Sequence, residues 1–400
     1  MNILCLMGLF PEEYEAEILK NSISGMQNAA NKLQWAIVDG LNSQENAKVE
    51  ILNSLYIGSY PKKYKQAKIP SFTFSIMGKE GGKNVGFLNL PIVKFASKYF
   101  SLKKELKKWL KQNKGEEKVI IAYAMTSPFV ELLDYAKKKC PEVKCLLFVP
   151  DLPEYMDVTN KSSIYNIVKK RHISHLKNNL NRVDGYVFLT DFMKEWFETQ
   201  VRYTVVEGIY KENQSATSSP ETKEKVVFYA GGLCEEYGVM DLVNAFLNCK
   251  TDDWKLEIVG DGPLLSRLQQ MASEDDSLIV RGILPNSEVL KRQKEVSILV
   301  NPRKAEQEFT KYSFPSKTIE YMSSGTPMLG FRLPGIPPEY HEHFYEITQE
   351  DGMETCLSKV MSLSSEEREN FGALAKEFIL KEKNSTKQCS KIMELIESMK

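Results

Sequence analysis

Short apolar runs alternate with segments of helical periodicity along most of this chain, and that alternation restricts the possible folds more than any other feature. Strands separated by helices pair in parallel, because the intervening helix returns the chain to the same end of the sheet. The sequence therefore predicts an α/β fold with doubly wound parallel sheets. The predicted strands are Asn2–Leu6, Val49–Leu52, Val119–Tyr123, Lys144–Val149, Gly185–Leu189, Tyr203–Val206, Val226–Ala230, Lys255–Val259, Leu278–Arg281, Val296–Val300 and Met328–Phe331.

The polar segment Lys211–Lys225 interrupts this alternation near the middle of the chain. A chain of 400 residues exceeds one ordinary hydrophobic core, so two domains are expected. We predict domains at 1–208 and 209–385, followed by a C-terminal helix at 386–400 that could pack back on the first domain. Two α/β domains of similar size are expected to face each other across a cleft, the default ligand site. Residues 9–24 are expected to form an irregular loop.

The composition is that of a globular protein, with 42% hydrophobic and 26% charged residues. No apolar run approaches the about 18–20 residues that a membrane-spanning helix needs. The first ten residues, MNILCLMGLF, lack a basic flank and are interpreted as a strand and not as a signal peptide. The seven cysteines are scattered, without the C-x-x-C spacing of zinc or redox sites. These features favour a cytoplasmic protein with reduced thiols.

Positive charge is concentrated in the first half of the chain, although the net charge is zero. Residues 1–200 hold 29 Lys and Arg against 21 Asp and Glu. A predicted helix at Phe95–Lys114 is especially basic, with lysines at 103, 104, 107, 108 and 111. These lysines indicate either a solvated helix face or a surface that lies on anionic lipid. The second interpretation would place the protein peripherally at the inner face of a membrane.

The stretch Asn301–Leu329 holds the clearest candidate site. It follows an apolar run that is predicted to be a buried strand, and a short helix is predicted to begin near Lys317. Ligands of open α/β sheets bind at the carboxyl ends of strands, and a helix start suits a phosphate because its N–H groups are free. Arg303 and Lys317 add positive charge, and Glu320 could accept hydrogen bonds from sugar hydroxyls. The stretch therefore predicts a ligand with both phosphate and hydroxyl groups.

The second half of the chain resembles the retaining glycosyltransferases of family four, which have the GT-B fold. The resemblance covers about residues 200–335 and is looser before them, where VPDLPEY at 149–155 is similar to bacterial members that build polysaccharides. It implies two Rossmann-like domains, the first for an acceptor and the second for a UDP- or GDP-sugar donor. The matching segments, in order, are VVFYAGGLCEEYGVMDLVNAF at 226–246, LEIVGDGPLLSRL at 256–268, VRGILPNSEVL at 280–290, NPR at 301–303 and FPSKTIEYMSSGTPML at 314–329.

The family's two glutamates are only partly present. The second falls on Glu320, which the resemblance implies would bind the ribose hydroxyls of the nucleotide. The first falls on Tyr312 and is therefore absent. Glu308 or Glu306 in the preceding loop could replace it, and the alternative is that both are solvated loop carboxylates.

The family's Arg and Lys after the first strand of this domain fall on Gly232 and Tyr237, so both charges are missing. One reading is an inactive protein. The other is that Arg303 and Lys317, with nearby backbone N–H groups, bind the departing diphosphate instead. The donor-binding residues that the resemblance implies are Gly231, Gly232, Arg281, Arg303, Phe314, Pro315, Ser316, Lys317 and Glu320.

The candidate catalytic residues are Asp151, Glu308 and Lys317. Many family members carry a His-Asp pair after a strand of the first domain, and Asp151 stands there, although a lone Asp is also a common helix cap. The four histidines show no metal-ligand spacing. Because the family generally needs no metal, no metal or other cofactor is expected, and the nucleotide sugar is a substrate.

We therefore expect a glycosyltransferase that moves a sugar from a nucleotide sugar to an acceptor hydroxyl, with retention by family resemblance. The expected setting is cell-surface polysaccharide or glycolipid assembly, with a glycan or lipid-linked acceptor, an anionic membrane surface as a further partner, and no nucleic acid. One alternative is a non-catalytic partner of another transferase that binds a nucleotide sugar, which Gly232 and Tyr237 favour. The other is a GT-B nucleotide-sugar epimerase, which would need carboxylates and a His near the sugar carbon.

Overall fold

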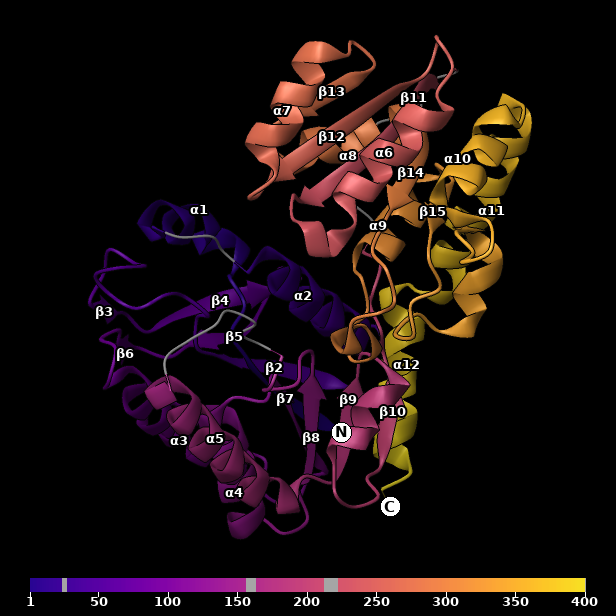
Figure 1. The fold of residues 1–400 in the computed structure, drawn as a ribbon. Coiled ribbons are helices and arrows are strands. Elements are labelled where there is room, and N and C mark those ends of the chain that lie inside the picture. Colours follow the sequence, from indigo (N-terminus) through magenta and orange to yellow (C-terminus); the bar gives the residue numbers. More distant parts are fainter. Residues whose placement is uncertain (24–26, 156–162, 212–221, 400) are drawn as a thin grey trace. The chain divides into compact units, whose positions relative to one another are not determined.

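The computed structural model describes residues 1–23, 27–155, 163–211 and 222–399. Residues 212–221, most of the polar segment Lys211–Lys225, lie outside the described residues. The chain divides into two compact units (Figure 1). Unit 1 comprises Met1–Ile209 and Ser385–Lys400, and unit 2 comprises Tyr210–Asn384.

Unit 1 is built on a sheet of eight described strands in the order β10-β9-β8-β7-β1-β2-β5-β4. Neighbours pair in parallel except β4 and β5, which form an antiparallel hairpin at one edge. The central strands are buried along nearly all their length, as expected when helices cover both faces. The strands are β1 Asn2–Met7, β2 Lys48–Asn53, β4 Phe72–Ile76, β5 Lys79–Asn84, β7 Lys118–Tyr123, β8 Lys144–Val149, β9 Gly185–Phe188 and β10 Tyr203–Val205, and a separate pair joins β3 Lys68–Ile69 to β6 Phe87–Leu88.

The larger helices of unit 1 form two groups, because α2 packs against α12 while α4 contacts both α3 and α5. Figure 1 shows these groups on opposite faces of the sheet. This arrangement confirms the predicted doubly wound α/β architecture for unit 1. The helices are α1 Glu12–Asn21, α2 Asn28–Asn42, α3 Lys94–Gln112, α4 Ser127–Lys139, α5 Ser163–Asn179 and α12 Ser385–Glu397.

Helix α1 corrects one prediction, because the irregular loop expected over 9–24 contains a helix of ten residues. Three glutamates occupy its first turn, where negative charge suits the positive end of the helix dipole. Ile18 is its buried residue and joins a small apolar cluster with Phe10 and Tyr64. The half-buried Tyr14, one turn before Ile18, stacks on Phe72 with ring centroids 4.0 Å apart. Two apolar contacts in a helix of ten residues give a weak periodic signal, which is why the pattern did not predict it.

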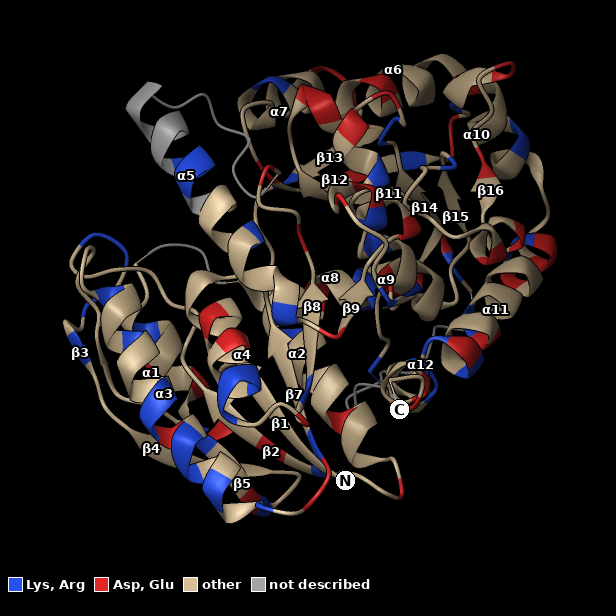
Figure 2. Ribbon diagram, turned by 90° about the horizontal axis from the view of Figure 1, so that it is seen from below, with Lys and Arg blue, Asp and Glu red and all other residues tan. Residues whose placement is uncertain are grey.

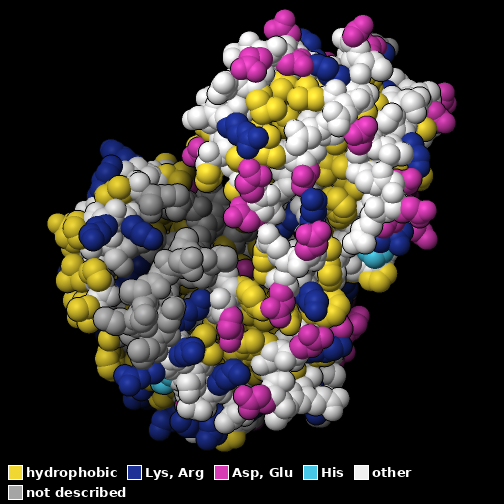
Figure 3. All heavy atoms as spheres, in the orientation of Figure 1, with side chains coloured by type: hydrophobic (Ala, Val, Ile, Leu, Met, Phe, Trp, Pro, Cys, Tyr) yellow, Lys and Arg dark blue, Asp and Glu magenta, His cyan; other side chains and the backbone are white. Residues whose placement is uncertain are grey.

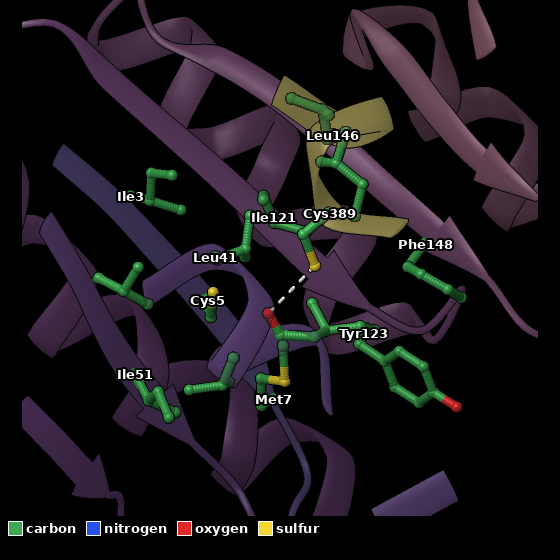
Figure 4. Packing of buried hydrophobic residues seen from close by; sticks show 14 of the residues in the cluster. Ile3, Cys5, Met7, Leu41, Ile51, Ile121, Tyr123, Leu146, Phe148 and Cys389 are labelled. Carbon is green, nitrogen blue, oxygen red and sulfur yellow. Dashed lines mark hydrogen bonds between the residues drawn. The ribbon is translucent and has the colours of Figure 1, made fainter. Parts of the chain in front are cut away.

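Helix α12 belongs to the core of unit 1 although it ends the chain. Its Cys389 and Ile392 are fully buried with residues of β1, β7 and α2 (Figure 4). The thiol of Cys389 donates to the carbonyl of Ile37 at 3.5 Å. Gly40 makes the close approach possible, since a Cβ there would lie 2.2 Å from the carbonyl oxygen of Ser385. The last residues of the chain are thus part of the folding unit that contains the first.

Unit 2 contains a parallel sheet of six described strands in the order β13-β12-β11-β14-β15-β16. Its strands β11, β12 and β14 carry the fully buried residues of a second core, so the prediction of a second parallel α/β unit is confirmed. No helix in the described part of the chain is long and apolar enough to cross a membrane. The strands are β11 Glu224–Gly232, β12 Lys255–Asp261, β13 Leu278–Arg281, β14 Val296–Asn301, β15 Met328–Gly330 and β16 Tyr345–Glu346, and the helices are α6 Val239–Cys249, α7 Leu265–Glu274, α8 Asn286–Glu295, α9 Lys317–Ser324, α10 Gly352–Ser362 and α11 Ser365–Glu382.

Candidate functional site

The carboxyl ends of β11, β12 and β14 come together at one edge of the unit 2 sheet. Gly231 and Gly260 lie opposite each other in the register of β11 and β12. A Cβ on Gly260 would lie only 1.8 Å from the carbonyl oxygen of Gly231, and its φ of +149° also favours glycine. The glycines therefore bring backbone together at the strand ends, where ligands of open α/β sheets bind.

Lys317 is the first residue of α9, and its ammonium group reaches across to the end of β11. Its Nζ donates to the carbonyl of Ala230 and lies 5.8 Å from the ring centroid of Tyr229. Burial lowers the pKa of Lys317, while the negative charge of Glu320 acts in the opposite direction. A partly buried ammonium at the start of a helix adds a full charge to the positive end of the helix dipole.

Glu320 stands one turn into α9 and is held from a neighbouring helix. The side-chain amide of Gln293 on α8 donates to its Oε1 at 2.7 Å. Glu320 is half-buried, so one carboxylate oxygen is fixed by the protein while the residue keeps access to solvent. The sequence prediction identified Glu320, but it missed Gln293, which has no local pattern that marks it.

Arg303 follows β14 and lies between two aromatic rings. Its guanidinium carbon is 5.3 Å from the ring centroid of Tyr237 and 4.3 Å from that of Phe309. Its Nε is buried without a hydrogen-bond partner among the described residues. Burial lowers the pKa of Arg303. Arg303 and Lys317 both lie near the phenol of Tyr229, so two of the predicted cations meet beside the end of β11.

The segment before α9 supplies packing and the first turn of the helix. Phe314 and Pro315 are buried, with the Phe314 ring centroid 5.4 Å from that of Tyr340. Ser316 is exposed at the N-cap position and makes no side-chain cap. The first N–H groups of a helix have no acceptor within that helix, although here the N–H of Thr318 donates to the carbonyl of Pro315 at 2.8 Å. The N–H groups of Ser316 and Lys317 are therefore the ones that suit an anion at this end.

Arg281, the last residue of β13, donates to a buried carboxylate on the neighbouring strand β12. Its Nε donates at 2.9 Å to Glu257, whose side chain is fully buried. Arg292 on α8 donates to the same carboxylate at 2.7 Å. This network explains Arg281 as a stabilising residue, and its predicted contact to a donor stays a prediction.

The other two predicted catalytic residues belong to different units. Glu308 is exposed at the start of a short 3₁₀-helix, Glu308–Lys311. Asp151 belongs to unit 1, directly after β8. Although Asp151 is exposed, surrounding atoms desolvate its carboxyl group and raise its pKa.

A second candidate site would need a cavity or a metal-binding group elsewhere among the described residues. An open pocket of about 440 Å³ lies between α6 and α10, lined among others by Asn248 and Lys359. It sits at the C-terminal end of α6, which is the opposite end of the sheet from Lys317 because α6 runs back against the strands. The described residues contain no group of three His, Cys, Asp or Glu side chains that could hold a metal ion.

Unit 1 carries an exposed apolar segment next to basic side chains. Ile92 is 93% exposed and Phe95 is 57% exposed. The segment runs beside β3, because β6 pairs with β3 through Lys68 and Leu88. Figure 3 shows hydrophobic side chains gathered at this edge of unit 1, and Figure 2 shows Lys and Arg along α3. The exposed apolar residues are Leu88, Leu90, Ile92, Val93 and Phe95, and the exposed lysines nearby are Lys62, Lys63, Lys65 and Lys68.

Comparison with known proteins identifies relatives for the region that contains the strand-end cluster. Residues 224–363 match the family model described as "Glycosyl transferases group 1". N-acetyl-alpha-D-glucosaminyl L-malate synthase of Bacillus anthracis is 26% identical over 171 residues, which are 41% of this chain and 43% of that protein. The chain therefore aligns with less than half of the length of that relative.

Solved structures of similar architecture extend over the whole chain. The lipopolysaccharide outer core galactosyltransferase WaaB superposes with a TM-score of 0.62 at 16% identity, covering 100% of this chain and 99% of that one. HepE from Anabaena, solved in complex with UDP, gives 0.59 at 14% identity and covers all of both chains. Sucrose-phosphate synthase from Thermosynechococcus elongatus gives 0.60 at 12% identity, covering 100% and 99%. At these identities the likeness shows the fold, which is the predicted GT-B fold with two Rossmann-like domains.

Proposed function

We propose, from the match of residues 224–363 to the family model of the group 1 glycosyl transferases, that this chain transfers a sugar from a nucleotide sugar to an acceptor hydroxyl. The observation that carries the proposal is the cluster at the end of β11. Arg303 and Lys317 lie there beside the last residues of the strand, and Glu320 lies one helical turn after Lys317 in α9. Two cations and a carboxylate suit a ligand that joins a diphosphate to a ribose. WaaB is named as a galactosyltransferase and HepE was solved with UDP, which supports a nucleotide-sugar donor.

The diphosphate is the leaving group of such a transfer, so stabilising its charge is the principal task of unit 2. Lys317 and Arg303 would supply positive charge, and the N–H groups of Ser316 and Lys317 would donate to phosphate oxygens. Glu320, fixed by Gln293, would accept from the two ribose hydroxyls. Gly231 and Gly232 would lie near the phosphates through their backbone, while Tyr229 and Tyr237 fill the space that a Cβ at these two positions would need.

The acceptor side of the proposal rests on unit 1. Asp151 would contact the transferred sugar or the acceptor, and because burial raises the pKa of its carboxyl group, it would be a stronger proton acceptor than an ordinary aspartate. Glu308 would act from unit 2 on the donor sugar in place of the glutamate that Tyr312 replaces. Transfer with the acceptor attacking as the diphosphate departs needs positioning and leaving-group stabilisation, and no enzyme nucleophile. It also needs no metal in this proposal, because the protein provides the cations.

A second candidate function is a non-catalytic partner that binds a nucleotide sugar without transferring it. Gly232 and Tyr237 favour this alternative, since neither provides a charge where the resemblance leads one to expect a cation.

A donor panel separates the two functions. The protein is incubated with UDP- and GDP-sugars, with and without a lipid extract, and released UDP or GDP is measured. A transferase releases nucleotide from one donor and releases more when the acceptor is present. Binding of a donor without release in any mixture would favour the non-catalytic function. No binding of any nucleotide sugar or nucleoside diphosphate would refute both.

We also propose that the protein works at the cytoplasmic face of an anionic membrane and docks there through the segment 88–95. The exposed side chains of Ile92 and Phe95 would enter the interface, and the nearby lysines would contact anionic headgroups. Such a surface would bring a lipid-linked glycan acceptor to unit 1.

Vesicle sedimentation tests the docking surface. The wild type should bind anionic vesicles at low salt, bind zwitterionic vesicles weakly, and dissociate as salt screens the lysines. Replacing Ile92 and Phe95 by Glu should lower the partition coefficient at least about tenfold. Leu374→Glu is the matched control, because Leu374 is 60% exposed but belongs to unit 2. Equal binding of the double variant and the control would rule out this segment.

A further inference from the structure

Gly232 and Tyr237 are in direct steric relation, although they are separated in sequence by four residues. A Cβ built on Gly232 would lie 2.9 Å from Cε2 and 3.2 Å from Cδ2 of the Tyr237 ring. The ring therefore occupies the space into which any larger side chain at 232 would begin. A side chain at 232 and the observed position of Tyr237 exclude each other, so the two residues depend on one another.

The Tyr237 ring also contacts the guanidinium group of Arg303. The guanidinium carbon lies 5.3 Å from the Tyr237 centroid and 4.3 Å from the Phe309 centroid, both within the range of cation–π attraction. Aromatic rings on two elements thus define where the guanidinium can lie. Phe309 belongs to the short 3₁₀-helix Glu308–Lys311, and Tyr237 to the one at Glu235–Tyr237.

Gly238 lets the turn that carries Tyr237 lie close to the backbone before Arg303. Its φ of +72° is in the left-handed region that favours glycine. A Cβ there would lie 2.3 Å from the carbonyl oxygen of Pro302, the residue before Arg303. The turn that carries Tyr237 can therefore approach the Arg303 backbone only because position 238 has no side chain.

The charge of Arg303 has no acidic partner among the described residues. Its Nε is buried and lacks a hydrogen bond there, and the neighbours that influence it electrostatically are Tyr237, Tyr229 and Cys234. An Arg held in this way is stabilised by rings and not by a carboxylate, which leaves its positive charge available to an anion. A desolvated cation also interacts more strongly with such an anion than an exposed one would.

We propose that Gly232 and Tyr237 form one coupled substitution that transfers the phosphate-binding charge of the donor site to Arg303, with Tyr237 and Phe309 as positioning residues. The ligand is the diphosphate of a nucleoside diphosphate or nucleotide sugar, so this inference rests on the proposed function. The two positions that lack a charge are then not a sign of lost activity. Gly232 provides the space for the Tyr237 ring, and that ring positions the guanidinium group of Arg303, which lies in the loop after β14.

The test measures UDP and GDP binding to the full-length chain by isothermal titration calorimetry. Tyr237→Leu removes the ring and should weaken binding about tenfold, the scale of one desolvated cation–π contact. Tyr237→Phe keeps the ring and should bind within about twofold of the wild type, since the π-face is unchanged. Arg303→Met should weaken binding at least as much as Tyr237→Leu. In the Arg303→Met background, Tyr237→Leu should have no further effect.

Gly232→Ala tests the coupling itself. It should weaken binding when Tyr237 is present, because the added methyl displaces the ring, and should have little effect in the Tyr237→Leu background. Thermal unfolding of each variant identifies general destabilisation. If Tyr237→Leu binds like the wild type, or weakens binding equally with and without Arg303, the positioning role is refuted. A wild type that binds neither UDP nor GDP would refute the proposed function as well, so the two failures are distinguishable.

Discussion

Removing Arg292 should destabilise unit 2 far more than removing Arg281, although both pair with Glu257. The Glu257 side chain is fully buried, the Arg292 side chain is 18% exposed, and the Arg281 side chain is 51% exposed. Arg292 also donates to Glu224 at 2.7 Å and to Glu295 at 3.0 Å. Arg292→Met therefore deletes a network that joins α8 to two strands and leaves Glu257 with one half-exposed partner.

The size of the effect follows from what remains buried. Breaking a buried ion pair by removing one partner costs about 3–5 kcal/mol, because the remaining charge stays desolvated. Since Arg281 still contacts Glu257, we expect about 3 kcal/mol for Arg292→Met. Arg281→Met should cost about 1 kcal/mol or less, as for other solvent-screened pairs. At about 2–4 °C per kcal/mol for a domain of this size, Arg292→Met lowers the melting temperature of unit 2 by roughly 6–12 °C.

Urea and thermal unfolding followed by circular dichroism measure these differences. Arg267→Met is the control, because Arg267 is 63% exposed and reaches Glu235 only at 3.7 Å. Glu257→Gln in the Arg292→Met background should restore part of the lost stability, since the unpaired charge is then gone. A loss below about 1 kcal/mol for Arg292→Met, or no recovery in the double variant, would refute the argument from the buried carboxylate. Arg281→Met, measured for UDP binding as well, tests its predicted donor contact.

Three further predictions concern the site, the chain end and pH. Lys317→Ala should lower turnover on the order of 10²-fold, as for the loss of one donor to the leaving group, while Lys359→Ala should leave turnover unchanged. Because the pKa of Lys317 is lowered, wild-type turnover should decrease with rising pH, and the decrease should begin at a lower pH than the deprotonation of an ordinary lysine would give. Gly40→Ala should destabilise unit 1 by about 1–3 kcal/mol in urea unfolding, although Ala is the better helix former, because its Cβ would meet Ser385 and Cys389; an increase in stability would contradict the α2–α12 contact. Burial lowers the pKa of Lys94 to about 8. Between that pH and the ordinary lysine pKa of about 10.4, the unfolded chain therefore binds more protons than the folded one. The free energy of unfolding should then rise with pH, and the slope should be steeper in the wild type than in Lys94→Met by up to about 1.4 kcal/mol per pH unit.

The architecture was predictable because it depends on periodicity that survives in the sequence. Strands buried on both faces read as continuous apolar runs, as in Val296–Val300, and the helices between them force parallel pairing. The short helix after Ser316 was predictable because local residues mark its start and Gly325 ends it. The helix α1 was not, because only Tyr14 and Ile18 anchor it and two contacts make a weak periodic pattern.

The candidate site was predictable only where its residues lie on one continuous stretch. Arg303, Lys317 and Glu320 follow one strand, so their common location at its carboxyl end could be inferred from topology. Gln293 and Phe309 could not be identified, because a hydrogen bond or a ring contact between elements has no signature in either segment.

The sequence by itself determined that the chain folds into parallel α/β units, and it predicts that candidate phosphate-binding side chains follow β14, because both inferences depend on local order. The sequence left the packing of a C-terminal helix on the first domain open, and the tertiary structure decided that Ser385–Glu397 completes the core of unit 1. That Tyr237 lies against Arg303 was decided by the tertiary structure alone. Sequence shows that Gly232 and Tyr237 carry no charge. Their effect on Arg303 depends on packing at contact distance, and packing between distant segments is set only when the chain has folded.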